Sequence, residues 1–288
     1  MPKLKQYQST IACPVSLNGI GLHSGQNISM KLLPAEVNSG IVFKRVDLPN
    51  KPEMAAVFNH VNSTFMCTSL DGEFRLSTVE HFLAAVAGLS IDNILVEING
   101  EELPILDGSS QNYIFILQAA GIIEQPKKRK YLKLTKEFTV ENDGGYIKML
   151  PYNGLRISYQ LDYKHPEFSS NNQHVIDFKK SLFMFDIAAA RTFGFVSDFC
   201  YLREKGLIKG GSMDNALVFD DNKLLNPEGF RFNNECARHK VLDVVGDLML
   251  LGLPLMADLS CFKSGHTLNH MLVKQIIQSK DHYEIVEL

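Results

Sequence analysis

The stretch VLDVVGDLMLLGLPLMADLS, residues 241–260, is the most hydrophobic part of the chain, and it constrains the fold more than any other segment. It contains three aspartates and a proline, and such charges are costly inside a lipid bilayer, so it is unsuited to crossing a membrane. The pattern instead predicts a buried helix over residues 233–252. Because a buried carboxylate needs a partner, the fold must bring polar groups to Asp243 and Asp247.

His239 and Asp243 lie four residues apart in the predicted helix, which places their side chains about 40° apart on one face. Both can therefore reach one metal ion. Histidine nitrogens with one carboxylate oxygen, and a fourth position left for water, are typical of catalytic zinc sites. Asp247 extends the same face by one turn, and a histidine would be a natural partner for it. The spacing also arises by chance, and Asp243 could instead pair with Arg238 or Lys240.

A third ligand is needed, and nothing local decides which of the nine histidines supplies it. His81 stands out because Glu80 precedes it in LSTVEHFLAAVAGL, residues 76–89, whose apolar residues recur at helical spacing. Ser77 lies three residues before Glu80, which predicts a capping box at the helix start. Neighbouring helical side chains diverge by about 100°, so Glu80 would flank the metal and reach a bound water. Taken alone, Glu80 could serve only as the cap.

The order of predicted elements indicates an α+β fold with two similar domains, each a small, mostly antiparallel sheet with packed helices. A chain of 288 residues suits two domains of ordinary size. PKKRK, residues 126–130, is the densest charge run, and we expect it to be a solvated linker between domains 1–126 and 127–288. In the second domain, residues 181–193 predict a helix that reaches a loop at Gly194.

The composition of the chain limits its expected cellular location and its expected binding partners. The formal net charge of −3 offers no general attraction for nucleic acid or anionic membranes. Five cysteines lie at wide spacings without a CxxC pair, which favours a reducing compartment. The N-terminus lacks the apolar core of a secretory signal, and no run of about 18 apolar residues is present. We therefore expect a cytoplasmic protein with no nucleic-acid partner and no stable membrane insertion.

Several motifs follow one another in the order in which one enzyme family carries them. They are TVEHFLAAVAGLSIDNILVEING, PILDGSS, ARTFGF, GGSMDNALV, RHKVLDVVGDL and KSGHTLNH. Through these motifs the chain closely resembles the UDP-3-O-acyl-N-acetylglucosamine deacetylases. The resemblance runs from GIGLHSG at residues 19–25 to the last predicted helix, and the combination of motifs is highly specific.

The resemblance implies a zinc-dependent hydrolase whose active site lies at the interface of the two domains. The three implied zinc ligands are His81, His239 and Asp243. Glu80 would be the general base that activates the zinc-bound water. His266, in its protonated form, would stabilise the oxyanion and donate a proton to the leaving amine, while Asp247 orients it. Thr192 would offer its hydroxyl to the developing oxyanion. Fe²⁺ can suit a similar ligand set and could replace zinc in the cell.

The implied substrate is UDP-3-O-(3-hydroxyacyl)-N-acetylglucosamine, which would lose its N-acetyl group in the committed step of lipid A biosynthesis. Lys240 and Lys263 could meet the sugar or the diphosphate as point charges, or be ordinary solvent-facing lysines. Members of the family carry an inserted unit that forms a passage for the acyl chain, here at about residues 195–216. Phe193 would stand at its mouth and Phe195 in its wall, although such residues are also typical of an ordinary core.

Two other functions remain open: a zinc amidohydrolase acting on another N-acetylated amino sugar, and a non-catalytic zinc-binding protein with four protein ligands. A metal phosphohydrolase of the adjacent His-Asp type is excluded, because no histidine in the chain is followed by aspartate. We expect the chain to act as a monomer. The resemblance implies that His23, in GIGLHSG, approaches the site, although a histidine in a turn is the default interpretation. The histidines to which we assign no role are His60, His165, His174, His270 and His282.

Overall fold

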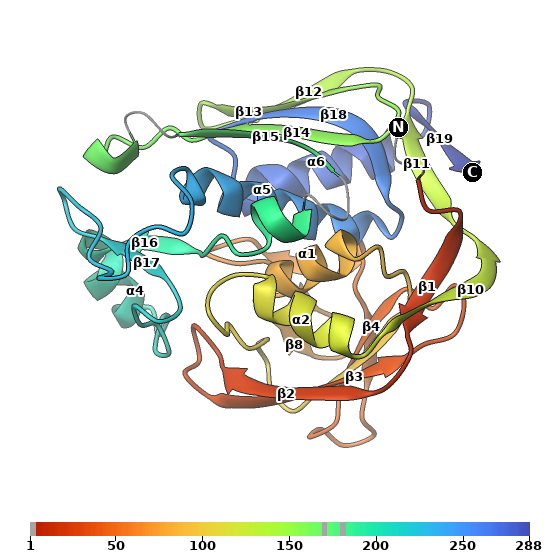
Figure 1. Cartoon of the computed structure of the whole chain (residues 1–288), viewed down its shortest axis with the longest axis horizontal. Coiled ribbons are helices and arrows are strands. Elements are labelled where there is room, and N and C mark those ends of the chain that lie inside the picture. Colours follow the sequence, from red (N-terminus) through yellow and green to blue (C-terminus); the bar gives the residue numbers. More distant parts are fainter. Residues whose placement is uncertain (1–3, 169–171, 179–182) are drawn as a thin grey trace.

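The computed structural model describes residues 4–168, 172–178 and 183–288. Figure 1 shows sheets on two opposite sides of the molecule, with helices packed between them. The sheet at the bottom of the view comes from the first half of the chain, and the sheet at the top comes from the second half. This arrangement confirms the predicted α+β class.

The first half is built on a five-stranded sheet. In spatial order its strands are β2 (Val15–Ile20), β3 (Asn27–Pro34), β9 (Ile94–Ile98), β4 (Ile41–Arg45) and β5 (Glu53–Ala55). Neighbouring strands are antiparallel except β4 and β9, which run parallel. Side chains alternate along β3, so that Ile28, Met30 and Leu32 enter the core. The sheet therefore has one buried face, against which the helices of this half pack.

The second half is built on a seven-stranded sheet. Its strands are β11 (Lys130–Leu134), β12 (Phe138–Asn142), β13 (Gly145–Leu150), β14 (Leu155–Gln160), β15 (Gln173–Asp177), β18 (Leu255–Phe262) and β19 (Tyr283–Glu287). β18 joins the sheet together, because it pairs with β13 antiparallel and with β11 and β14 parallel. Most of its side chains are buried, and its backbone is paired along both edges.

The longer helices of the described residues lie between the two sheets (Figure 1). They are α1 (Glu80–Gly88), α2 (Gln111–Ala119), α5 (Glu235–Leu248) and α6 (His266–Gln278). α1 packs directly on α5 at Gly246, where an added Cβ would lie 2.2 Å from the carbonyl oxygen of Glu80. Glycine at this position lets the two backbones approach closely. Within the described residues, no helix is long and apolar enough to cross a membrane.

Smaller elements surround this core. The strands among them are β1 (Tyr7–Ile11) with β10 (Ile122–Lys128), and a separate sheet of β6 (Val61–Ser63), β7 (Ser69–Asp71) and β8 (Arg75–Leu76). The short helical turns are η1 (Phe58–His60), η2 (Pro166–Phe168), the π-helical η3 (Phe183–Ile187), η4 (Val196–Asp198) and η5 (Met249–Leu251). The connection from β6 to β7 reaches α6, where Thr64 Oγ1 lies 2.8 Å from Thr267 Oγ1.

A small unit projects from the second half at the left of Figure 1. In it, β16 (Phe193–Phe195) and β17 (Leu217–Phe219) pair in parallel, and α4 (Phe199–Glu204) lies on the connection between them. Parallel neighbours require a crossover connection of this kind. The connection exposes several large apolar side chains, namely Val196, Phe199, Tyr201 and Met213.

The predicted capping box at the start of α1 is wrong. The helix begins at Glu80 with Val79 as its N-cap, and no side chain caps it. Ser77 instead donates its hydroxyl to the carbonyl oxygen of Glu101 at 3.1 Å. The Glu80 carboxylate accepts a hydrogen bond from the backbone N–H of Thr68, so it is held by a different part of the chain.

The prediction that residues 126–130 form a solvated linker is also wrong. Pro126 to Lys128 belong to β10, and Lys130 begins β11. Arg129 between them is buried, and its Nε donates to Asp92 Oδ1 at 2.7 Å. Sequence polarity was misleading here because one of the charges is neutralised by a residue 37 positions away.

The predicted helix over residues 181–193 is correct only in part. Residues 181 and 182 lie outside the described residues, η3 forms one π-helical turn, and Gly194 lies in β16 rather than in a loop. Arg191 explains the early end, because its backbone N–H and its Nε both donate to Glu235 Oε1 at the start of α5. This buried pairing holds Arg191 against α5, and the helical turn ends before it, at Ile187.

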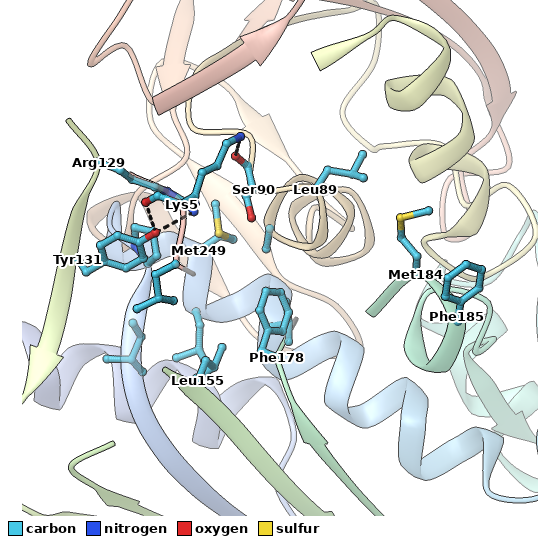
Figure 2. A pocket seen from close by; sticks show the side chains of 16 residues that line it. Lys5, Leu89, Ser90, Arg129, Tyr131, Leu155, Phe178, Met184, Phe185 and Met249 are labelled. Atoms are coloured by element: carbon cyan, nitrogen blue, oxygen red, sulfur yellow. Dashed lines mark hydrogen bonds between the residues drawn. The ribbon is translucent and has the colours of Figure 1, made fainter. Parts of the chain in front are cut away.

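A cavity of about 630 Å³, here called the rear cavity, lies at the C-terminal ends of α1 and α5. Most of its wall is apolar, with leucine, valine, methionine and phenylalanine side chains. Figure 2 shows its polar residues gathered on one side, where Lys5, Ser90 and Tyr131 hydrogen-bond among themselves. The rear cavity contains none of the predicted site residues in its wall.

Candidate metal centre and active site

Three side chains, here called the ligand trio (His81, His239 and Asp243), meet where α1 packs on α5. His81 is the second residue of α1, and the other two lie one turn apart on α5. Asp243 Oδ1 lies 3.3 Å from His239 Nε2 and 3.8 Å from His81 Nε2. One ligand atom from each residue lies within 4.8 Å of the others, and all three side chains are buried. The trio is close enough to hold one metal ion, with ligands from both halves of the chain.

Two features of the ligand trio suit a cation. His239 Nδ1 lies 3.0 Å from the carbonyl oxygen of Ala190, and since a carbonyl only accepts, Nδ1 carries the proton and Nε2 keeps its lone pair. Asp243 Oδ1 is buried, and no hydrogen-bond donor reaches it from the described residues. Such an oxygen is costly to bury unless a cation binds it. Two imidazoles and one carboxylate are a donor set that fits zinc or ferrous iron.

The protonation of the ligand trio also favours metal binding. Burial lowers the pKa of His81 to about 3, and the neighbouring His239 adds to this effect. Burial likewise lowers the pKa of His239. Burial alone would raise the pKa of Asp243, but His239 and Lys240 outweigh it and hold that pKa below its usual range. At neutral pH the imidazoles are therefore neutral and the carboxylate is charged, as metal ligands must be.

Glu80 lies beside the ligand trio, one residue before His81. Its side chain is buried, its Oε2 accepts the backbone N–H of Thr68 at 3.1 Å, and its Oε1 lies 3.7 Å from His266 Nε2. Burial raises the pKa of Glu80 to about 7, although the charge of His266 opposes the shift. A carboxylate with this pKa can take up and release a proton near neutral pH.

His266, the first residue of α6, forms the second titratable group beside the trio. Its Nδ1 donates to Asp247 Oδ2 at 2.9 Å, and Asp247 is fully buried on α5. Burial alone would lower the pKa of His266, but the Asp247 carboxylate and its hydrogen bond raise that pKa to about 9. His266 is therefore a cation at neutral pH, with Nε2 directed toward Glu80. Asp247 has the histidine partner that its burial required.

Three residues that we did not predict complete the surroundings of Asp247. Thr68 Oγ1 donates to Asp247 Oδ1 at 2.5 Å, and Asn269 Nδ2 donates to Oδ2 at 2.8 Å. His270 Nε2 lies 3.5 Å from Oδ1, so His270 belongs to this buried network although we assigned it no role. The spacing of four residues from His266 on a predicted helix was a usable signal for His270. No local pattern pointed to Thr68.

Thr192 lies two residues after Ala190, whose carbonyl holds His239. Its backbone N–H donates to the carbonyl oxygen of Gly108 at 2.8 Å, and its own carbonyl oxygen accepts the N–H of Leu217 at 2.8 Å. Between Ala190 and Thr192, Arg191 is anchored to α5 through Glu235. The segment is thus fixed on both sides, and the half-buried side chain of Thr192 stands next to the start of β16.

The two predicted substrate lysines have different surroundings. Lys240 Nζ donates to Asp243 Oδ2 at 2.8 Å and lies 5.4 Å from the ring centre of Phe193. Burial would lower the pKa of Lys240, but the Asp243 carboxylate outweighs burial and raises it. Lys263 is exposed, and its Nζ donates to the carbonyl oxygen of Asp143 in the turn between β12 and β13. Lys240 therefore contacts the ligand trio directly, whereas Lys263 contacts the turn between β12 and β13.

Phe193 and Phe195 belong to an aromatic cluster beside Lys240. Their ring centres each lie 5.6 Å from that of Tyr163, and both rings are only partly buried. The other members that pack with them are His165, Phe168 and Phe219. Lys240 contacts both Asp243 and Phe193, so it connects this cluster, part of which lies in β16 and β17, to the ligand trio.

A buried centre of two histidines and one carboxylate, flanked by a glutamate near neutral pKa and a histidine cation, is the arrangement of a metal-dependent hydrolase. The sequence profile of one such family, the UDP-3-O-acyl N-acetylglycosamine deacetylases, matches residues 8–278. The chain belongs to this family, as its motifs predicted.

Individual relatives agree with the profile. UDP-3-O-acyl-N-acetylglucosamine deacetylases of Shewanella frigidimarina and Shewanella halifaxensis are each 44% identical to the chain over 283 residues. The corresponding protein of Shewanella piezotolerans is 43% identical over 283 residues. Each alignment covers 97% of this chain and 92% of the relative, so the similarity extends through both halves.

Proposed function

We propose that the chain is a zinc-dependent hydrolase that removes the N-acetyl group of UDP-3-O-(3-hydroxyacyl)-N-acetylglucosamine, which is the committed step of lipid A biosynthesis. The products are acetate and the free amine. The observation that carries the proposal is the buried ligand trio with Glu80 and His266 beside it. The names of the relatives supply the substrate.

We assign the metal to the ligand trio. When bound there, the metal would supply an acidified water and a Lewis acid for the acetyl carbonyl. Its three protein ligands would leave a position for that water, which distinguishes a catalytic from a closed structural site. The same donors suit Fe²⁺, so we propose zinc with ferrous iron as a second metal in the cell.

Glu80 acts as the general base in this proposal. Its carboxylate flanks the ligand trio without belonging to it, and Thr68 holds only one of its oxygens. The other oxygen, Oε1, can take the proton of the attacking water. A pKa of about 7 suits this task, because about half of the groups are then ionised at neutral pH and the carboxylate is still basic enough to accept a proton.

His266 acts as the general acid. Expulsion of the amine requires a proton on the glucosamine nitrogen, since an amide anion is a very poor leaving group. The protonated ring also stabilises negative charge on the carbonyl oxygen during attack. Asp247 keeps Nδ1 protonated and fixes the ring plane, so Nε2 is the atom that delivers the proton. A pKa of about 9 keeps the ring charged at neutral pH.

We assign the substrate side of the site to residues around β16. Thr192 offers its hydroxyl to the developing oxyanion, and Lys240 stands close enough to the ligand trio to meet the sugar or its phosphate. Lys263 would contribute a second positive charge at the rim. Phe193 and Phe195 would border an apolar passage for the acyl chain, formed by residues 195–216 and supported by the exposed apolar side chains there.

We further propose that the chain is a cytoplasmic monomer with domains 1–126 and 127–288. The five-stranded sheet uses only strands before that boundary, and the seven-stranded sheet uses only strands after it, which supports the division. Glu80 and His81 would then come from the first domain, with the remaining acid, base and metal residues from the second. An active site at this interface explains why neither half carries a complete set.

Assaying deacetylation of the acylated UDP-sugar before and after metal removal tests the function. We expect a chelator to abolish acetate release, and stoichiometric Zn²⁺ or Fe²⁺ to restore it. A parallel assay on UDP-N-acetylglucosamine without the acyl chain should show much lower activity. Equal activity on both would favour a general amino-sugar amidohydrolase. No acetate release with any metal would overturn the hydrolase assignment.

A further inference from the structure

Thr68 is a fully buried residue that directly precedes β7. Its backbone N–H donates to Glu80 Oε2 at 3.1 Å, and its carbonyl oxygen accepts the N–H of Val79 at 3.4 Å. Glu80 is the first residue of α1, and Val79 is its N-cap. The backbone of Thr68 therefore fixes one oxygen of the proposed base.

The side-chain hydroxyl of Thr68 supports the proposed acid. Oγ1 lies 2.5 Å from Asp247 Oδ1, and since an ionised carboxylate only accepts, the hydroxyl must donate to it. Asp247 holds His266 Nδ1 through its other oxygen at 2.9 Å. A single residue thus binds the base through its backbone and the acid through Asp247, and its Oγ1 also lies 3.3 Å from His266 Nδ1 itself.

His270 determines the direction of that hydroxyl. Its Nε2 lies 3.0 Å from Thr68 Oγ1, whose only proton is committed to Asp247, so Nε2 must be the donor. The hydrogen bonds therefore run one way, from His270 through Thr68 to Asp247. His270 and His266 lie one turn apart on α6 and reach Asp247 from the same face.

The segment that carries Thr68 is also held against α6 at a second point. Thr64 Oγ1 and Thr267 Oγ1 lie 2.8 Å apart, next to His266. Thr68 comes from the first half of the chain, whereas Asp247 and His270 come from α5 and α6. The contact at Thr68 consequently joins the two halves at the point where their reactive groups face each other.

We propose that Thr68 is a positioning residue that fixes the base Glu80 and the acid His266 relative to each other, and that His270 orients its hydroxyl. The inference rests on the proposed function. Without the hydroxyl, Asp247 loses a donor and holds His266 less firmly, so Nε2 can move from its place 3.7 Å from Glu80 Oε1. Misplaced acid and base groups slow the chemical step more than they weaken substrate binding.

Paired substitutions separate the hydroxyl from the shape of the side chain. Thr68→Val keeps the shape and removes the hydroxyl, and we expect kcat to fall by about 10–100-fold with KM changed less than about twofold and metal content unchanged. Thr68→Ser keeps the hydroxyl, and we expect kcat within about threefold of the native protein. Equal losses in both variants would show that Thr68 serves only packing and would overturn the inference.

Thr10→Val is the matched control. Thr10, in β1, is also buried, and its Oγ1 accepts a hydrogen bond from the N–H of Ala35, which follows β3. Both residues are far along the chain from the ligand trio. This variant should lose stability comparable to that of Thr68→Val, measured by denaturant unfolding, and keep native kcat. If Thr10→Val lowers kcat as much as Thr68→Val, the effect is general destabilisation and the inference fails.

A double-mutant cycle tests whether Thr68 acts through Asp247. In an Asp247→Asn background, Thr68→Val should lower kcat by less than about threefold, because the carboxylate it supports is already absent. Independent, multiplicative effects would overturn the inference.

His270→Phe should also lower kcat, but by a smaller factor than Thr68→Val. A native kcat in His270→Phe would show that His270 does not orient the Thr68 hydroxyl. Native protein without deacetylase activity would instead refute the proposed function itself.

Discussion

The two ends of the α1–α5 contact differ in chemistry although the same helices build both. At the N-terminal end of α1, Glu80 and His81 meet the ligands of α5 and a histidine cation of α6. At the C-terminal ends of both helices, Leu89, Leu248 and Met249 line the rear cavity (Figure 2). The rear cavity has a volume of about 630 Å³, yet the titratable side chains of the proposed active site converge at the other end. Our proposal for the active site therefore rests on this clustering of side chains and not on cavity volume.

The polar groups at the two ends also differ in their partners. Beside the rear cavity, Arg129 pairs with Asp92 at 2.7 Å, and Tyr131 donates its hydroxyl to the carbonyl oxygen of Lys5 at 2.6 Å. At the reactive end, Asp243 Oδ1 is buried with no donor among the described residues. A buried oxygen without a donor needs an explanation, and a cation bound to the ligand trio would supply one for Asp243 Oδ1. Substitutions at the N-terminal end of α1 should consequently lower turnover more than stability. Substitutions beside the rear cavity should lower stability more than turnover.

Glu80→Gln should give the largest loss of turnover. The amide cannot accept the proton of the attacking water, so we expect kcat to fall by roughly 10²–10⁴-fold. The residue flanks the ligand trio without belonging to it, so zinc should remain stoichiometric and the protein folded. Metal analysis and steady-state kinetics check both. His239→Ala is the contrasting variant, which should lose zinc as well, and near-native turnover in Glu80→Gln would refute the role.

Asp247→Asn should give the next largest loss, about 10–100-fold in kcat, and it should also change the pH profile. In the native protein, activity should rise as Glu80 ionises through its pKa of about 7 and fall as His266 deprotonates through its pKa of about 9. Removing the Asp247 charge lowers the pKa of His266, so the falling limb should move to lower pH. A falling limb at its native position would separate Asp247 from the charge of His266.

Much of the proposed active site could be predicted from the sequence because its residues lie on three regular helices, α1, α5 and α6. The spacing of His239, Asp243 and Asp247 fixes their common face on α5, and that geometry follows from helical period alone. The choice of His81 and His266 depended on the resemblance to a known family. Periodicity cannot decide which distant histidine completes a site.

The residues that escaped prediction are held by contacts between distant segments. Thr68 lies 179 positions from Asp247, and it belongs to no helix or strand that a pattern could detect. Arg129 lies in a run of charges that predicts a solvated linker, but it pairs with Asp92, which lies 37 positions away. Ser77 and Glu80 had the spacing of a capping box, but tertiary contacts with Glu101 and Thr68 prevailed over it. In each case a contact between segments far apart in the sequence, which a local pattern cannot show, determined the structure.

Gly246→Ala should affect both ends of the contact, since Gly246 lies where the two helices touch. The added methyl would meet the Glu80 carbonyl oxygen at 2.2 Å, so α1 and α5 must separate. We expect a loss of about 1–3 kcal/mol in the free energy of unfolding and roughly a tenfold fall in kcat. Gly194→Ala is the control for stability, because an added Cβ there meets nothing within 4 Å. Native kcat in Gly246→Ala would show that the site tolerates helix separation.

Leu89→Ala should have the smallest effect on turnover and the largest on stability. Leu89 is fully buried at the end of α1 and lines the rear cavity, so truncation removes packing where space already exists. We expect the free energy of unfolding to fall by about 2–5 kcal/mol, with kcat within about twofold of native at a temperature where the variant is folded. Denaturant unfolding and the deacetylase assay measure the two quantities on one sample. If kcat instead falls as far as in Gly246→Ala, the rear cavity is mechanically coupled to the ligand trio, and the division of the α1–α5 contact into a reactive end and a structural end is wrong.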